Sequence, residues 1–195
     1  MTTKTVLTCA VLVCALSVPA LSDGGAKDQV KGWLIAGSTP RDFEFGTARV
    51  DGTSGKCAFI KAKIAPSPSG FGTLMQEVAS DNYRGKRLRV SATIKTADAE
   101  RAQLWMRVDG PDGKSLAFYN MDDRAITGTT PWRPYSIVLD VPTNATDVAF
   151  GYFLNGKGTA WADAFKLEVV GKNVPVSVMK SPDLPKSPAN MDFEQ

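Results

Sequence analysis

The sequence predicts an all-β fold, an antiparallel jelly-roll β-sandwich, and three observations support this. Short stretches of alternating apolar and polar residues recur along most of the 195-residue chain. Clusters of Gly, Pro, Asn and Asp separate these stretches and indicate turns. Beyond the N-terminal segment, no window keeps the apolar spacing of an amphipathic helix for three turns. Many short strands without helical crossovers favour a sandwich or a barrel.

The first element, residues 1–22, has the pattern of a secretory signal peptide. Lys4 supplies the positive start, residues 5–18 are apolar, and Ala20 and Ser22 are the small residues that a cleavage site requires. We therefore expect a secreted or periplasmic protein. A membrane anchor is the alternative, but the apolar run is short for a bilayer, so we expect no membrane span after cleavage.

The cysteines agree with this division of the chain. Cys9 and Cys14 lie in the signal segment, and neither follows the small residue that a lipoprotein signal usually has. The mature chain then keeps Cys57 alone, so no intramolecular disulfide can form within it. We expect Cys57 to be a buried and unreactive thiol.

Residues 23–171 form the predicted sandwich domain. Its clearest strand alternates strictly, with Leu88, Val90 and Ile94 on one side and charged or hydroxyl residues on the other. The strands are predicted at residues 33–38, 57–64, 72–79, 87–96, 102–109, 115–121, 135–141, 146–154 and 159–170. The turns between them are predicted at residues 65–72, 110–115, 127–132 and 154–159.

The strand at 102–109 has two faces, and the question is which of them belongs to the core. If Leu104 and Met106 face the core, then Trp105 and Arg107 lie on the outer face of a sheet. The alternative is that a loop covers Trp105 and that its role is structural, since tryptophan is usually well buried.

The last segment, residues 172–195, has a different composition. It holds four of the twelve prolines of the chain and cannot continue a sheet, so it is predicted to be an extended tail. It ends in the strand-like residues 190–194.

Composition excludes several functions. The chain has no histidine, which removes the Ser-His-Asp and Cys-His types of catalysis. The net charge of +3 is small and spread along the chain, so we expect no nucleic-acid partner. No convincing pair of catalytic carboxylates is present either, and the chain is predicted not to be an enzyme.

Five sequence stretches carry a likeness to a known domain: "FGTLMQEVASDNYRGKRLRVSATIKT", "LWMRVDG", "LAFYNM", "ITGTTPWRPYSIVLDVP" and "AFGYFLNGKGTAWADAFKLEVV". They resemble a bacterial β-sandwich domain of the galactose-binding or carbohydrate-binding-module type, which is also attached to some AraC-type transcriptional regulators. The likeness covers Gly32 to about Gly171. It implies a jelly-roll fold without catalytic machinery, and no helix-turn-helix pattern accompanies it here.

The resemblance also implies a structural calcium ion and a role for the tail. Such domains often begin with an N-x-x-F-E strand, which here is absent before Gly32 but is present as Asn190–Glu194. We expect this segment to complete its own sandwich or to be donated to a neighbouring molecule, unless it is a frayed remnant. Asp163 matches an acidic calcium position of the family, and Glu194 would be its partner if the tail docks, although Ala164 replaces a second aspartate.

A sugar site requires aromatic faces for C–H groups and amides or arginine for hydroxyls. Strand alternation suggests that one sheet face carries Trp105, Arg107, Asn120, Gln76 and Tyr119, although the family more often has aspartate at the position of Tyr119. The predicted function is a secreted, non-catalytic carbohydrate-binding-like module that binds a glycan of unknown identity. The alternative is a structural or protein-interaction sandwich that uses its C-terminal strand for self-completion or assembly.

Overall fold

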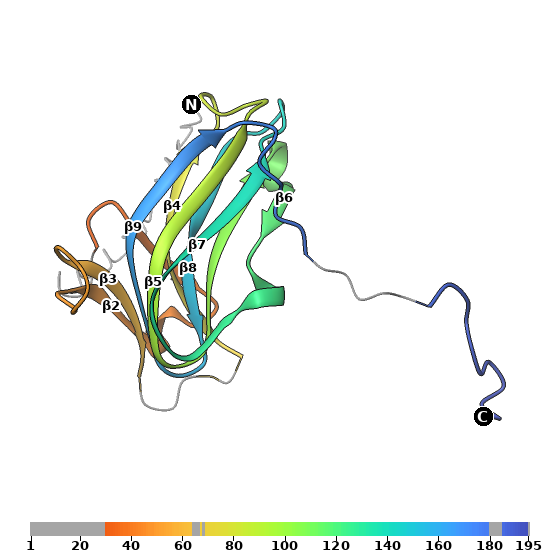
Figure 1. Ribbon diagram of the computed structural model, residues 1–195. Helices are drawn as coiled ribbons and strands as arrows, with labels where there is room; N and C mark the ends of the chain where they lie inside the picture. The colour runs from red at the N-terminus through yellow and green to blue at the C-terminus, as the bar shows by residue number, and fades with distance from the viewer. Residues whose placement is uncertain (1–29, 64–66, 68, 180–184, 195) are drawn as a thin grey trace, which may run out of the picture.

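The computed structural model describes residues 30–63, 67, 69–179 and 185–194, which form a β-sandwich with an extended C-terminal tail (Figure 1). The predicted signal peptide, residues 1–22, lies outside the described residues. The regular elements of the described part are strands and three short 3-10 turns. The strands are β1 (Leu34–Gly37), β2 (Phe43–Ala48), β3 (Cys57–Ala62), β4 (Phe71–Ala79), β5 (Arg87–Asp109), β6 (Ser115–Tyr119), β7 (Ile126–Asp140), β8 (Asp147–Asn155) and β9 (Thr159–Val170).

Strand β5 belongs to both layers of the sandwich, because its two halves pair with different neighbours. Residues 87–97 pair with β9 and residues 101–109 pair with β8. On its other side, β5 pairs with β7 between residues 87 and 102 and with β6 at residues 106–109. The first layer, sheet I, has the order β2-β3-β9-β5-β7, and the second, sheet II, has the order β1-β4-β8-β5-β6. All these pairings are antiparallel, so the predicted fold class is confirmed.

The chain crosses from sheet I to sheet II at a bend in β5. Asp98 lies there with a positive φ of 51°, and its backbone N–H donates to the Thr129 hydroxyl at 3.0 Å. Gly158, in the turn between β8 and β9, approaches so closely that a Cβ at this position would lie 2.6 Å from the Ala99 nitrogen. This contact and its φ of 102° require glycine at Gly158.

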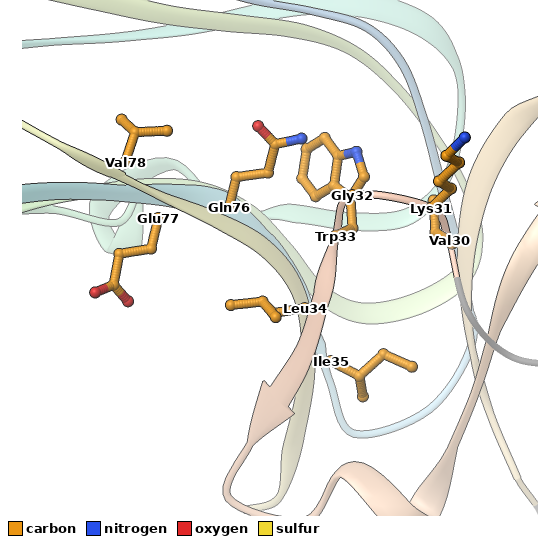
Figure 2. A pocket seen from close by; sticks show the side chains of 9 residues that line it. All are labelled: Val30, Lys31, Gly32, Trp33, Leu34, Ile35, Gln76, Glu77 and Val78. Atoms are coloured by element: carbon orange, nitrogen blue, oxygen red, sulfur yellow. The ribbon is translucent and has the colours of Figure 1, made fainter.

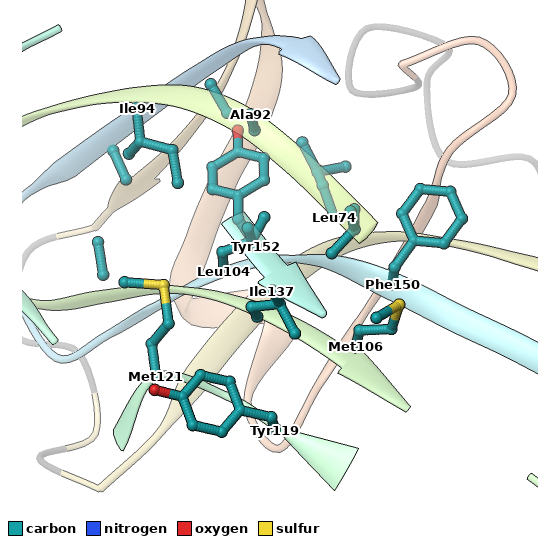
Figure 3. Packing of buried hydrophobic residues seen from close by; sticks show 14 of the residues in the cluster. Leu74, Ala92, Ile94, Leu104, Met106, Tyr119, Met121, Ile137, Phe150 and Tyr152 are labelled. Carbon is teal, nitrogen blue, oxygen red and sulfur yellow. The ribbon is translucent and has the colours of Figure 1, made fainter. Parts of the chain in front are cut away.

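The core lies between the two sheets, as Figure 3 shows. Leu88, Val90 and Ile94 reach it from sheet I, while Leu104 and Met106 reach it from sheet II, and all five are fully buried. The inward face predicted for both halves of β5 is therefore confirmed. Burying side chains of this size stabilises the fold by about 1.5–3 kcal/mol each.

Two segments were predicted wrongly, in addition to the division of β5 into two strands. Strand β2 was not predicted, because its alternation is only three residues long before Gly46, yet Phe43 and Phe45 are buried. Residues 127–132, predicted as a turn, belong to the first half of β7. The ladder between β5 and β7 is irregular there, with register shifts at three places, and so it tolerates Gly128 and Pro131.

The start of the tail covers the edge of sheet I. The Ser177 backbone N–H donates to the Val138 carbonyl at 2.8 Å, and the Val138 N–H donates to the Ser177 hydroxyl at 3.1 Å. Asp140 pairs with Arg87 and with Lys172, each at 2.8 Å. These two cations hold the pKa of Asp140 well below its usual value. The pairing fastens the tail along β7, which protects an edge strand from wrong partners.

The end of the tail does not pair with either sheet in the described part of the chain. The Phe193 N–H donates to the Asn190 carbonyl at 3.2 Å, which makes residues 190–193 a turn. Met191 and Phe193 are 76% and 89% exposed, and the segment lies apart from the sandwich (Figure 1). A docked strand at 190–194 therefore stays a prediction.

Candidate functional site

A groove of about 580 Å³ lies on the outer face of sheet II. It runs across the five strands of sheet II, from β1 over β4, β8 and β5 to the end of β6. Phe153 from β8 adds a further aromatic ring. The groove is lined by Ala36, Gly37, Ser38, Phe71, Thr73, Met75, Trp105, Arg107, Phe118, Asn120 and Phe153. Aromatic walls with a few polar groups are typical of a small-ligand site.

The floor of the groove is fixed by a chain of hydrogen bonds. Trp105 Nε1 donates to the Thr73 hydroxyl at 3.0 Å, and that hydroxyl donates to the Tyr152 carbonyl at 2.8 Å. Trp105 is only 7% exposed, so its indole forms the base of the groove rather than a free binding platform. Gly151 lies opposite Trp105 in the pairing of β5 with β8.

The exposed aromatic surface comes from other residues. Phe118 is 49% exposed and lies opposite Arg107 in the pairing of β5 with β6. Phe71 and Phe153 form a second wall, with their ring centroids 5.4 Å apart. Sequence reasoning missed these three rings. Knowledge of the strand register would have found Phe118 and Phe153, because residues paired across a ladder lie on the same face.

The polar groups of the groove are held in place. Arg107 Nε donates to Asp109 Oδ2 at 2.7 Å. The carbonyl of Asn120 accepts from Gln103 Nε2 at 2.7 Å, and its Oδ1 accepts from the Asp122 N–H at 3.1 Å. The Nδ2 of Asn120 and the terminal nitrogens of Arg107 are therefore the donors that a ligand in the groove would meet.

Gln76 and Tyr119 do not share this face, so the predicted five-residue face was wrong for these two. Tyr119 pairs with Met106, and Gln76 pairs with Phe150. Met106 and Phe150 are both buried in the core, so their partners lie on the core side of the sheet. Tyr119 directly precedes Asn120, and adjacent strand residues point to opposite faces.

Tyr119 instead anchors the loop after β6. Its hydroxyl donates to Asp123 Oδ1 at 2.7 Å and accepts from Arg124 Nε at 3.0 Å. Burial and the bond to Asp123 raise the pKa of Tyr119. The residue therefore supports the groove wall formed by Phe118 and Asn120 without entering the groove.

Gln76 lines a second, larger hollow of about 1060 Å³ at the edge of sheet II. Its amide lies beside the indole of Trp33, whereas Leu34 and Glu77 lie on the other side of the strands (Figure 2). Trp33 is packed against Phe165, with the ring centroids 4.7 Å apart. Trp33 is the one aromatic residue in the described lining of this hollow, and its ring already packs against Phe165. The hollow is therefore a poorer sugar site than the groove, although it is larger.

The predicted calcium pair is not brought together. Asp163 Oδ1 accepts from the Ala164 N–H at 2.7 Å on β9, whereas Glu194 follows the tail turn at residues 190–193. The described residues contain no group of three or more acidic, cysteine or histidine side chains that could hold a metal ion. Calcium usually takes six to eight oxygen ligands, and of the predicted carboxylate pair only Asp163 lies on β9. Calcium binding stays a prediction.

Cys57 is buried at the junction of β2 and β3. Its thiol donates to the Ala48 carbonyl at 3.4 Å, and burial raises its pKa. A raised pKa leaves little reactive thiolate at neutral pH. This agrees with the unreactive thiol predicted from the sequence.

No family model matches the chain. The uncharacterized HTH-type transcriptional regulator YbfP of Bacillus subtilis (strain 168) is 42% identical over 170 residues, which cover 86% of this chain and 58% of that protein. The chain thus spans little more than half the length of this relative. No α-helix lies in the described residues, so they contain no helix-turn-helix.

Solved structures decide the fold. The CBM22-1 xylan-binding domain from Paenibacillus barcinonensis Xyn10C superimposes with a TM-score of 0.55 at 8% identity, over 74% of this chain and 89% of that domain. A CBM4 structure superimposes with a TM-score of 0.52 at 15% identity, over 74% of this chain and 93% of that chain. The fold is that of the carbohydrate-binding modules. The resemblance predicted from the sequence is confirmed at this level.

The same fold also occurs inside a larger protein. The enzymatically active domain of bacteriophage CBA120 tailspike protein 4 superimposes with a TM-score of 0.56 at 14% identity, over 73% of this chain but only 20% of that one.

Within the described residues of the present chain, no helix is long and apolar enough to span a membrane.

Proposed function

We propose that this chain is a non-catalytic carbohydrate-binding module that holds a glycan in the groove on sheet II. The observation that carries the proposal is the exposed ring of Phe118 beside the Arg107 guanidinium and the Asn120 amide. A sugar ring has an apolar C–H face and polar edges, so it needs an aromatic surface next to hydrogen-bond donors.

The absence of catalysis is part of the proposal. Glycoside hydrolysis commonly uses two carboxylic acids that flank the bond to be cleaved. The described lining of the groove contains one charged side chain, Arg107, and no carboxylate. The signal peptide predicted at residues 1–22 would deliver the module to the cell envelope or outside the cell, where glycans are abundant.

The replacement of Phe118 by alanine tests the groove. We expect affinity electrophoresis to show retention of the wild type by at least one of xylan, β-1,4-galactan or mixed-linkage β-glucan, with xylan first because a structural neighbour is named for it. In Phe118→Ala, retention should weaken about tenfold or more, equivalent to roughly 1.4 kcal/mol. The thermal midpoint should hardly change, because the ring is half exposed.

Phe193→Ala is the matched control, since it removes an exposed phenylalanine from the tail and should leave retention unchanged. Normal retention of Phe118→Ala would place the binding site elsewhere. A folded wild type that no polysaccharide retains would contradict the proposal.

A second function, strand-mediated assembly, is favoured by the open edge of β4. Strand β1 pairs with residues 72–75 only, so no described strand pairs with residues 76–79 on that side. The larger hollow lies there, and an edge with unpaired backbone groups can accept an added strand. The tail segment 190–194 has a suitable length and exposes two large apolar side chains.

Deletion of residues 188–195 tests this second function. If the segment docks on its own domain, the thermal midpoint should fall, and if it docks on a neighbour, the oligomer should dissociate in size-exclusion chromatography with light scattering. An unchanged midpoint together with an unchanged mass would contradict both forms. Glycan retention serves as the control, because the groove lies on the outer face and the deletion leaves it intact.

A further inference from the structure

The chemistry of the groove depends on a charge pair at its end. Arg107 and Asp109 lie two residues apart on β5, and Arg107 Nε donates to Asp109 Oδ2 at 2.7 Å. The arginine side chain is 43% exposed and lines the groove, whereas the aspartate side chain is 7% exposed and lies behind it. A ligand would therefore meet the cation, while its counter-charge is fixed in the protein.

The carboxylate has few other partners. Asp109 Oδ1 is buried and accepts no hydrogen bond from the described residues. Among these residues, Arg107 is therefore the one cation that donates a hydrogen bond to the carboxylate, through Oδ2. Asp147 lies directly opposite Asp109 in the pairing of β5 with β8, and it accepts from the Thr146 hydroxyl at 2.7 Å. Arg107 at the end of the groove therefore has two carboxylates near it, Asp109 and Asp147, neither of which lines the groove.

This arrangement disfavours an anionic ligand. A free guanidinium in a groove would bind the carboxylate of a uronic acid or a sulfate group in a two-pronged manner. Here the Nε edge is already occupied by Asp109, and a second anion at the terminal nitrogens would also meet the field of Asp109 and Asp147. The terminal nitrogens still donate hydrogen bonds to neutral hydroxyl groups.

We infer that Asp109 is a positioning residue that restricts the groove to uncharged glycans, by neutralising Arg107 and fixing its guanidinium as a donor of hydrogen bonds to sugar hydroxyls. This inference rests on the proposed function of the groove, and it adds the ligand class and the residue that determines it.

The test compares retention on neutral and anionic forms of the same backbone. Suitable pairs are hydroxyethylcellulose with carboxymethylcellulose, and methyl-esterified with de-esterified polygalacturonate, in affinity electrophoresis at low and at physiological salt. The wild type should be retained more strongly by the neutral member of any pair that it binds. Asp109→Asn keeps the shape of the side chain but frees the charge of Arg107. In this variant, the ratio of retention on the neutral polysaccharide to retention on the anionic one should fall about tenfold or more. The retention gained on the anionic polysaccharide should weaken as the salt concentration rises.

Asp112→Asn is the matched control. Asp112 lies three residues further along the chain, is exposed, and has a φ of 62° that asparagine tolerates. It changes the net charge by the same amount and should leave the ratio unchanged. An equal shift in both variants would reveal a general charge effect and overturn the inference, as would an unchanged ratio in Asp109→Asn.

Arg107→Gln gives an independent measurement with the opposite sign. It leaves the carboxylates of Asp109 and Asp147 without the cation, so overall retention should weaken while the anionic member is excluded more strongly still. A higher ratio supports the inference even if Asp109→Asn does not fold, whereas a lower ratio overturns it. Equal retention of the wild type by both members overturns the inference alone. If no polysaccharide in these pairs or in the panel of the proposed function retains the wild type, both the inference and the proposed function are overturned.

Discussion

Replacing Trp105 by alanine should lower the free energy of unfolding by about 3–5 kcal/mol. The indole is 7% exposed, so its removal leaves a cavity in the floor of the groove. It also leaves the Thr73 hydroxyl without the hydrogen bond that Trp105 Nε1 donates at 3.0 Å. Urea denaturation followed by circular dichroism measures the loss.

Trp105→Phe separates the two contributions. It keeps an aromatic ring in the floor but removes the N–H donor, so we expect a smaller loss, dominated by one hydrogen bond of about 1 kcal/mol and some lost packing. If Trp105→Ala cost less than about 1 kcal/mol, the ring would be exposed and would not be packed as the structure has it. Because a destabilised protein also binds poorly, Phe118 is the better reporter of glycan contact.

The sequence was sufficient for the fold class because the alternation in the first half of β5 is long and regular. Leu88, Val90 and Ile94 are spaced by even numbers of positions, so they lie on one face of a strand, and all three are buried. The same reasoning failed for β2, where only Phe43 and Phe45 carry the signal. It also divided β5 in two, because the bend at Asp98 interrupts the alternation without breaking the strand.

The site was predictable only in part, for a different physical reason. Trp105 and Arg107 alternate on one strand, so their shared face follows from local geometry. Gln76 and Phe118 lie on other strands, and their faces depend on register, which is set by pairings between segments far apart in the sequence. The exposed fraction of Trp105 likewise depends on neighbouring strands, and so no local pattern could show that the indole is buried.

Replacing Gly151 by alanine should lower the free energy of unfolding by about 1–3 kcal/mol. Gly151 lies between Trp105 on β5 and Met75 on β4. A Cβ at this position would lie 2.8 Å from the Met75 Cα and closer still to the Leu74 carbonyl oxygen. Both obstacles are backbone atoms, which cannot rotate away, so β4 must move away from β8. Urea denaturation measures the cost.

The same displacement should weaken glycan retention, because β4 carries Thr73 and Met75 to the groove. Gly55→Ala is the matched control, since a Cβ there would meet nothing within 4 Å, and it should change stability by less than about 0.5 kcal/mol. If Gly151→Ala were as harmless as Gly55→Ala, the close approach of β4 and β8 would not be a constraint on the fold. A destabilised Gly151→Ala with normal retention would instead mean that the bound glycan does not depend on the position of β4, and that the contacts from Phe118 and Arg107 are sufficient.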